Sequence, residues 1–168
     1  CRKIYQAMLG LLETGSHGEI RRLDPQGTRE LYAQRVKDTR MAFREFADME
    51  KRKVNQGSFR SRTYFVRFVK EAHESQAGYG RLRYTPLGRA AIEALIAGDE
   101  DAIFTPCRYL LHGVRSLEGP HIEDLREIVS FRGRFCEQAL TGEYVRAAGT
   151  LERVQSDRGD TWHRLLLG

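Results

Sequence analysis

The chain has 168 residues, of which 40% are hydrophobic and 30% are charged, a composition typical of one or two small globular domains and not of a disordered chain. Its net charge is +5, but residues 1–98 hold 19 Lys and Arg against 11 Asp and Glu, whereas residues 99–168 hold 9 against 12. No apolar run approaches the roughly 20 residues that span a bilayer, and no signal peptide is recognisable, so we expect a cytoplasmic protein with no membrane partner.

Helical patterns dominate the first half of the chain. Residues 3–13 place their apolar side chains on one face, and the polar, Gly-rich residues 14–18 end that helix. A long helix is expected over residues 28–54, because aromatic and aliphatic residues recur there at alternating spacings of four and three. A second face of this helix carries Lys37, Arg40, Arg44 and Lys51. That face is either a basic ridge that follows a phosphate backbone or an ordinary solvent-exposed helix face.

The remaining segments also read as helices. Residues 59–74 form an amphipathic pattern, and the Gly-rich, basic residues 77–84 are a loop or a small hairpin. Helix starts are expected at Thr85-Pro86, Thr105-Pro106 and Gly119-Pro120, because proline is favoured at the first helical position. The predicted fold is therefore all-α. It consists of two packed helical bundles, residues 1–98 and 99–168, with room for one small β-hairpin near residues 79–84.

The sequence lacks the motifs of common enzymes. We find no P-loop, no dinucleotide-binding glycine motif, no serine-hydrolase elbow and no zinc-protease motif. The three cysteines form no C-x-x-C pair and predict buried thiols in a reducing compartment. The five histidines are scattered, and the acids at residues 99–101 are expected to stabilise a helix N-terminus and not to hold a metal. We therefore expect a non-catalytic protein that binds no cofactor and no small-molecule ligand.

One short segment resembles a DNA-binding domain. The sequence GRLRYTPLGRAAIEAL, residues 80–95, is similar to the wing and closing helix of winged-helix bacterial regulators. The resemblance implies a wing strand at residues 82–84 and a recognition helix at residues 59–74. A protein of this kind would be a dimeric, sequence-specific transcription regulator.

The order of several motifs resembles the small subunit of CRISPR Cascade-type effector complexes. The motifs are GEIRRL (residues 18–23), LGRA (87–90), IEALIAGDEDAI (92–103), CRYLLHGVRSLEG (107–119) and HIEDLREIVSF (121–131). The resemblance covers about residues 5–131 and implies a non-catalytic, all-helical subunit. It would pack beside other effector subunits and further copies of itself along a guide RNA. Its basic face would hold the target or displaced DNA strand and stabilise the R-loop.

Both resemblances and the charge pattern point to the basic residues of the first half as nucleic-acid contacts. The residues expected to bind DNA or RNA are Arg21, Arg22, Lys37, Arg40, Arg44, Lys51, Arg52, Lys53, Arg60, Arg62, Arg67, Lys70, Arg81, Arg83 and Arg89. The alternative from a different class is an interaction protein, for example an inhibitor, whose basic face meets an acidic protein.

Overall fold

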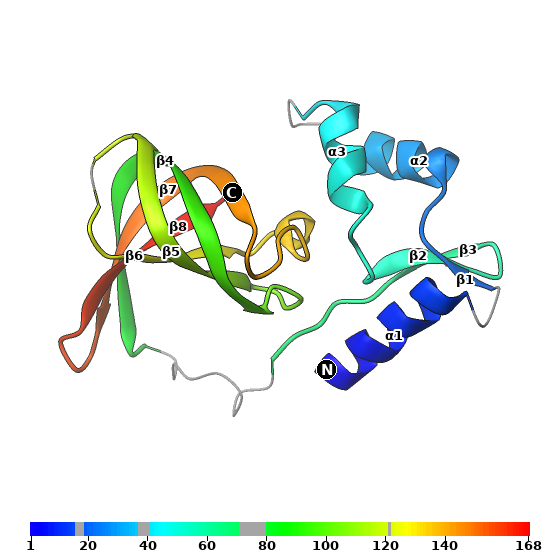
Figure 1. Ribbon diagram of the computed structural model, residues 1–168, viewed down its shortest axis with the longest axis horizontal. Helices are drawn as coiled ribbons and strands as arrows, with labels where there is room; N and C mark the ends of the chain where they lie inside the picture. Colours follow the sequence, from blue (N-terminus) through cyan, green and yellow to red (C-terminus); the bar gives the residue numbers. More distant parts are fainter. Residues whose placement is uncertain (16–18, 37–40, 71–79, 121) are drawn as a thin grey trace. The chain divides into compact units, whose positions relative to one another are not determined.

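The computed structural model describes residues 1–15, 19–36, 41–70, 80–120 and 122–168. The chain divides into two compact units, Cys1–Arg67 and Phe68–Gly168 (Figure 1). The first unit contains α-helices and a small sheet, and the second is built from long strands. Strands predominate overall, so the all-α prediction is wrong. The expected boundary after residue 98 falls inside one of these strands, because pairing with its neighbour, although irregular around Gly98, carries that strand on to Asp101.

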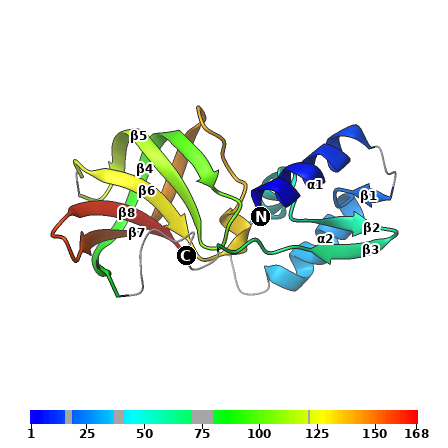
Figure 2. The same cartoon turned by 90° about the horizontal axis from the view of Figure 1, so that it is seen from below.

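The first unit has the element order of a winged-helix domain. Its elements are α1 (Arg2–Thr14), β1 (Ile20–Arg21), α2 (Pro25–Arg35), α3 (Phe43–Glu50), β2 (Gln56–Phe59) and β3 (Arg62–Phe65). The three strands form an antiparallel sheet in the order β1-β2-β3 (Figure 2). Strands β2 and β3, with the turn between them, are called the wing below. No described helix is long and apolar enough to cross a membrane.

The helix predicted over residues 28–54 is two helices. Asp24 begins α2, since its carboxylate accepts a 2.7 Å hydrogen bond from the Gly27 N–H and Pro25 occupies the first turn. The ring centroid of Tyr32 in α2 lies 5.4 Å from those of Phe43 and Phe46 in α3. The apolar spacing was misleading because these residues belong to two helices that pack against each other. One hydrophobic cluster is therefore shared by two helices. Of the four basic residues expected on one helix face, Arg44 lies on α3 and Lys51 follows it, whereas Lys37 and Arg40 lie outside the described residues.

The segment predicted as a helix from residue 59 forms the wing instead. Arg60 and Ser61 have φ values of 48° and 63°, which is the geometry of a two-residue type I′ hairpin turn. The aromatic and β-branched residues that follow, such as Thr63 and Tyr64, favour a strand. At Gly57, a β-carbon would lie 2.3 Å from the Arg21 carbonyl oxygen, so only glycine lets β1 approach β2 this closely.

The second unit is a closed five-stranded barrel. Its strands are β4 (Leu82–Asp101), β5 (Cys107–Glu118), β6 (Leu125–Ser130), β7 (Tyr144–Ser156) and β8 (Thr161–Leu167), with the short 3-10 helix η2 (Gly133–Phe135) after β6. The order around the barrel is β4-β5-β6-β8-β7. Neighbouring strands are antiparallel except β6 and β8, which are parallel. A long first strand that pairs with both β5 and β7 completes the topology of an OB-fold.

Alternate residues of β4 fill the barrel. Ala90, Ile92, Ala94 and Ile96 are buried in the core with Leu165 of β8, whereas the residues between them face outward. The wing strand that we expected at residues 82–84 is the start of β4 and pairs with β7. The helix expected at Thr85-Pro86 is also absent, because the sheet runs through Pro86 and accommodates it beside a β-bulge.

Candidate nucleic-acid interface

The tip of the wing brings exposed cations and an exposed ring together. The Arg60 guanidinium lies 5.4 Å from the centroid of the Phe59 ring, and its Nε is 2.7 Å from a carboxylate oxygen of Glu19. Phe59 is 46% exposed, and the β2–β3 register places it opposite Arg62, on the same side of the sheet. The exposed Arg62 has no hydrogen-bond or ion-pair partner within the described part of the chain. Two arginines and an aromatic ring thus share the outer end of the wing.

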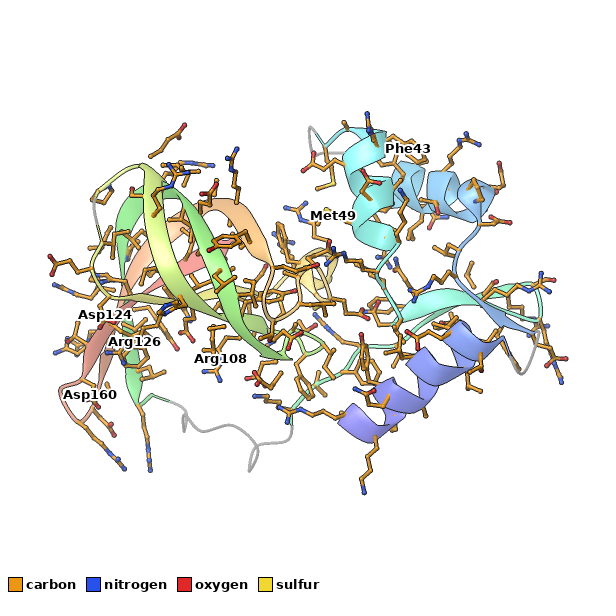
Figure 3. The ribbon with its side chains drawn as sticks, in the orientation of Figure 1. Phe43, Met49, Arg108, Asp124, Arg126 and Asp160 are labelled. Atoms are coloured by element: carbon orange, nitrogen blue, oxygen red, sulfur yellow. The ribbon has the colours of Figure 1, made fainter. Side chains whose placement is uncertain are left out.

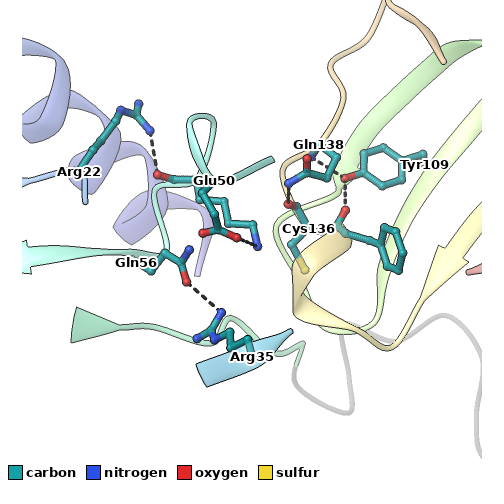
Figure 4. A network of polar contacts seen from close by, with 9 residues as sticks. Arg22, Arg35, Glu50, Gln56, Tyr109, Cys136 and Gln138 are labelled. Carbon is teal, nitrogen blue, oxygen red and sulfur yellow. Dashed lines mark hydrogen bonds and ion pairs between the residues drawn. The ribbon is translucent and has the colours of Figure 1, made fainter. Parts of the chain in front are cut away.

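The other face of the wing carries a second cation and ring. Arg35, the last residue of α2, donates a 3.1 Å hydrogen bond to Gln56 Oε1, and its guanidinium lies 5.2 Å from the Phe65 ring centroid (Figure 4). Phe65 is 52% exposed. The β1–β2 register places Arg21 opposite Ser58, on the face that Phe65 also occupies. Arg35 was not among the expected contact residues, because its ring partner, Phe65, is distant from it in the sequence.

Two of the expected contact residues have structural roles. Arg22 donates to the carbonyl oxygens of Lys51, at 3.1 Å, and of Lys53, at 2.8 Å, and so ties β1 to the segment after α3. The Lys53 side chain is 2% exposed, and its ammonium group lies 3.1 Å from Glu50 (Figure 4). A buried, paired ammonium group cannot reach a phosphate without unfolding. Arg22 and Lys53 therefore stabilise the fold of the first unit.

Helix α3 is a poor surface for phosphate. It carries one basic residue, Arg44, against three acids, Glu45, Asp48 and Glu50. Lys51 follows the helix, and its Nζ lies 2.6 Å from Asp48. This hydrogen bond from Lys51 holds the pKa of Asp48 below its ordinary value, so the carboxylate stays charged. Other cations of the first unit, such as Arg29, Arg52 and Arg67, are exposed but scattered, whereas Arg60 and Arg62 lie close together on the wing.

The other expected contact residues are dispersed. Arg52 and Arg67 are exposed in the first unit, and Lys70, Arg81, Arg83 and Arg89 belong to the barrel. Lys70 pairs with Asp101 at 2.6 Å, and Arg81 lies 4.0 Å from Asp157. The structure thus brings Arg60 and Arg62 together on the wing and places Arg21 on the same sheet. It does not gather all fifteen residues on one surface.

The surface of β5 and β6, which OB-folds commonly use for ligands, is electrically balanced in this barrel. Arg108 bridges Asp101 at 3.1 Å and Glu127 at 3.5 Å. On the adjoining strands, Arg164 lies 2.7 Å from Glu152. Together with Lys70, which pairs with Asp101, this surface and the adjoining strands hold three cations and three acids.

A second cluster lies at one end of the barrel, where Asp124, Arg126 and Asp160 are close together (Figure 3). Asp124 accepts two 2.8 Å hydrogen bonds from Arg126. This hydrogen bonding lowers the pKa of Asp124 and raises that of Arg126, so both groups remain charged over a wide pH range. The Arg126 guanidinium also lies 5.8 Å from the Trp162 ring centroid. The cluster is internally neutralised apart from Asp160.

The segment after β6 is held by a buried tyrosine. The Tyr109 hydroxyl donates to the Phe135 carbonyl oxygen at 2.6 Å and accepts from the Gln138 N–H at 3.0 Å (Figure 4). Burial raises the pKa of Tyr109.

Cys107 and Cys136 are buried and reduced in the barrel core, and a hydrogen bond between their thiols raises the pKa of Cys107. The prediction of buried thiols is confirmed for these two residues, whereas Cys1 is exposed.

The acids at residues 99–101 have a different setting from the helix N-terminus that we expected. They end β4, where Asp99 accepts a 3.0 Å hydrogen bond from Thr141 and Asp101 is paired with Arg108 and Lys70. Within the described ranges, no group of three His, Cys, Asp or Glu side chains could hold a metal ion.

The chain is similar to an uncharacterized protein, MJ1086, from Methanocaldococcus jannaschii. The two are 34% identical over 137 residues, which is 82% of this chain and 38% of that protein. The chain thus spans less than half the length of the relative that it matches. No protein-family model matches the chain, and no solved structure gives a significant match.

Proposed function

We propose that the chain is a non-catalytic nucleic-acid-binding protein of the cytoplasm and that residues 1–67 hold the backbone of a duplex through the wing. The observation that carries the proposal is the outer end of the wing, where Arg60, Arg62 and the ring of Phe59 are exposed together. Arginine suits this role because its planar guanidinium binds phosphate with two parallel hydrogen bonds and also enters narrow minor grooves.

The distribution of charge between the two units supports the proposal. Residues 1–67 contain 15 Lys and Arg against 8 Asp and Glu, whereas residues 68–168 contain 13 against 15. A net charge of +7 on so small a unit creates a positive field that attracts polyanions and speeds their association. The barrel, with a net charge of −2, adds nothing to that field.

The same charges indicate how the duplex is held. Winged-helix and related domains place a recognition helix in the major groove, where its side chains contact base edges. Helix α3 has a net charge of −2 and only eight residues, so it contributes little attraction to DNA. Affinity should come mainly from wing contacts to phosphates and the minor groove, which carry little sequence information. We therefore propose backbone binding with weak sequence preference, and not the sequence-specific regulator that the winged-helix resemblance implied.

Membership of a CRISPR effector complex is not part of this proposal. The resemblance depended on a series of helical motifs, and the motifs at residues 92–103 and 107–119 lie mostly on β4 and β5. Without the helical bundle, nothing in the fold favours that assembly. An acidic protein as the partner of the wing remains the competing outcome of the experiment below.

The test is duplex binding by the intact chain and two wing variants, measured by fluorescence anisotropy with two 20-base-pair DNAs of unrelated sequence. Arg62→Ala should weaken binding to both duplexes alike and reduce the log–log salt slope by about 0.9, the change for one lost phosphate contact. Glu19→Gln should tighten binding, because it releases Arg60 from its ion pair. Arg126→Ala removes an exposed arginine of the barrel and is the matched control, which should bind like the wild type.

The proposal fails if Arg62→Ala and Arg126→Ala have the same effect, or if the intact chain binds neither duplex at low salt. Tight binding to polyglutamate without binding to either duplex would favour an acidic protein partner instead.

A further inference from the structure

The outer side of β4, β5 and β7 carries more arginines than acids, unlike the balanced surface of β5 and β6. We call it the arginine face. Outward residues of these strands form it: Arg89, Ala91, Glu93 and Leu95 of β4, His112, Arg115 and Glu118 of β5, and Tyr144, Arg146, Ala148 and Thr150 of β7. Three arginines meet two glutamates here, whereas three cations meet three acids on the surface of β5 and β6 and the adjoining strands.

At the centre of the arginine face, one carboxylate orients two arginines. Glu93 lies between Arg115 and Arg146 in the strand register, and its two oxygens accept hydrogen bonds of 2.7 and 2.8 Å from them. The two arginine side chains are 63% and 75% exposed. These hydrogen bonds lower the pKa of Glu93, so it keeps its charge. Each guanidinium has five N–H donors and uses few of them on Glu93, so most remain available to a second acceptor.

An exposed ring stands beside this pair. Tyr144 is 74% exposed and lies opposite Leu95, with His112 on the other side of Leu95. It is two residues from Arg146, which places both on the same face about 7 Å apart along the strand. The ring thus lies in one row with Leu95 and His112, next to the two cations that Glu93 orients.

Small side chains keep the other side of the pair open. Ala91 lies opposite Ala148, and two residues further along β4 the exposed Arg89 lies opposite Thr150. Arg89 is therefore about 13 Å from the row of Glu93, and the row between them holds Ala91 and Ala148, with Glu118 opposite Ala91 on β5. Along β4 and β7, the face has cations on either side of two alanines and an aromatic ring beyond one of these cations.

We propose that the arginine face binds a single-stranded nucleic acid. Arg115 and Arg146 would hold one phosphate, Arg89 would meet the backbone further along the strand, and a base would stack on Tyr144. Stacking requires a free base face, which a single strand offers and a duplex hides. This inference goes beyond the proposed function, because it concerns a different unit of the chain and a different form of nucleic acid.

The test uses the full chain with fluorescently labelled 12-nucleotide oligo-dT and oligo-U. Tyr144→Ala should weaken binding at least fivefold, since the loss of one base–aromatic stack has about that effect, whereas Tyr144→Phe should retain wild-type affinity. Arg146→Ala should reduce the log–log salt slope by about 0.7, the single-strand value for one phosphate. Arg153→Ala is the matched control, because Arg153 is exposed on the same strand but alternation places it on the other side of the sheet.

Trp162 fluorescence should be identical in all four variants, which shows that the barrel is intact. The inference is overturned if Tyr144→Ala and Tyr144→Phe bind alike, or if Arg153→Ala costs as much as Arg146→Ala. The proposed function is tested separately by Arg62→Ala. If that variant alone abolishes binding of both duplex and oligonucleotide, the single strand binds to residues 1–67, and the arginine face is not its site.

Discussion

Replacing Gly57 by alanine should loosen the wing and leave the barrel intact. The added β-carbon would stand 2.3 Å from the Arg21 carbonyl oxygen and 2.9 Å from the Tyr64 ring. Since β-carbons in proteins do not come within 3.0 Å of such atoms, β1 must move away from β2 by at least 0.7 Å. Strand β1 has only two paired residues, so this displacement removes much of its pairing.

The expected cost is about 1–3 kcal/mol, the usual range for overpacking, which is a change of about 5- to 150-fold in the unfolding equilibrium. Each unit offers its own probe of unfolding. The described α-helices all lie in Cys1–Arg67, so circular dichroism at 222 nm reports mainly on that unit. The single tryptophan, Trp162, lies in β8 and reports on the barrel. In urea titrations, Gly57→Ala should lower the midpoint seen by circular dichroism and leave that of Trp162 fluorescence unchanged.

Gly149→Ala is the matched control in the barrel. Its β-carbon would lie 2.4 Å from the Leu166 carbonyl oxygen, between β7 and β8. This variant should lower the fluorescence midpoint and spare the circular dichroism transition. An unchanged circular dichroism midpoint for Gly57→Ala would refute the close approach of β1 and β2. If each variant lowered the circular dichroism and fluorescence midpoints equally, the two glycine contacts would not act on separate units, and the reasoning would be refuted.

Three further changes test the barrel. Leu165→Ala, at a fully buried position in β8, should destabilise the barrel by about 2–5 kcal/mol, measured from Trp162 fluorescence in urea. Tyr109→Phe should destabilise the barrel by about 1–3 kcal/mol, because the variant loses the hydrogen bonds of the hydroxyl group to the Phe135 carbonyl oxygen and from the Gln138 N–H. Faster hydrogen exchange confined to the segment after β6 would report this loss, and unchanged exchange would contradict it. The fold raises the pKa of Cys107 and of Tyr109, so the unfolded chain releases these protons first as pH rises. The contribution of these two groups to the free energy of unfolding should therefore be fully present below about pH 8.5 and decrease above it. In Cys107→Ala the decrease should be smaller up to about pH 10, where tyrosine titrates. An unfolding free energy that stays constant up to about pH 10.5 would contradict the burial of these groups.

Sequence patterns predicted some local features and failed where long-range pairing decides the structure. The helix expected over residues 3–13 is confirmed as Arg2–Thr14, because its amphipathic spacing and the following glycine act locally. Residues 90–97 contain four alanines, one leucine and one glutamate, residue types that favour a helix in isolation. In the barrel they pair on both sides with β5 and β7, and this pairing overrides the preference. The alternation of Ala90, Ile92, Ala94 and Ile96 was present in the sequence and was the signal to weigh against composition.

The candidate site was predictable in kind but not in arrangement. Composition alone placed the positive charge in the first half of the chain, and Arg60 and Arg62 were among the expected contacts. Which cations are exposed depends on partners distant in sequence, as for Arg22, which binds carbonyl oxygens about 30 residues away. The pairing of Glu93 with Arg115 and Arg146 spans three strands and has no local sequence pattern. Only the barrel topology brings those three side chains together.

The most direct test of the central claim is hydrogen–deuterium exchange of the intact chain with and without a saturating 20-base-pair DNA duplex. Binding through the wing should slow exchange of the amides in residues 56–65, because the duplex contacts the outer end of this hairpin. Exchange in the segments of β5 and β6 should be unchanged. Protection confined to Phe68–Gly168, or no protection anywhere under conditions where the duplex is bound, would contradict the account.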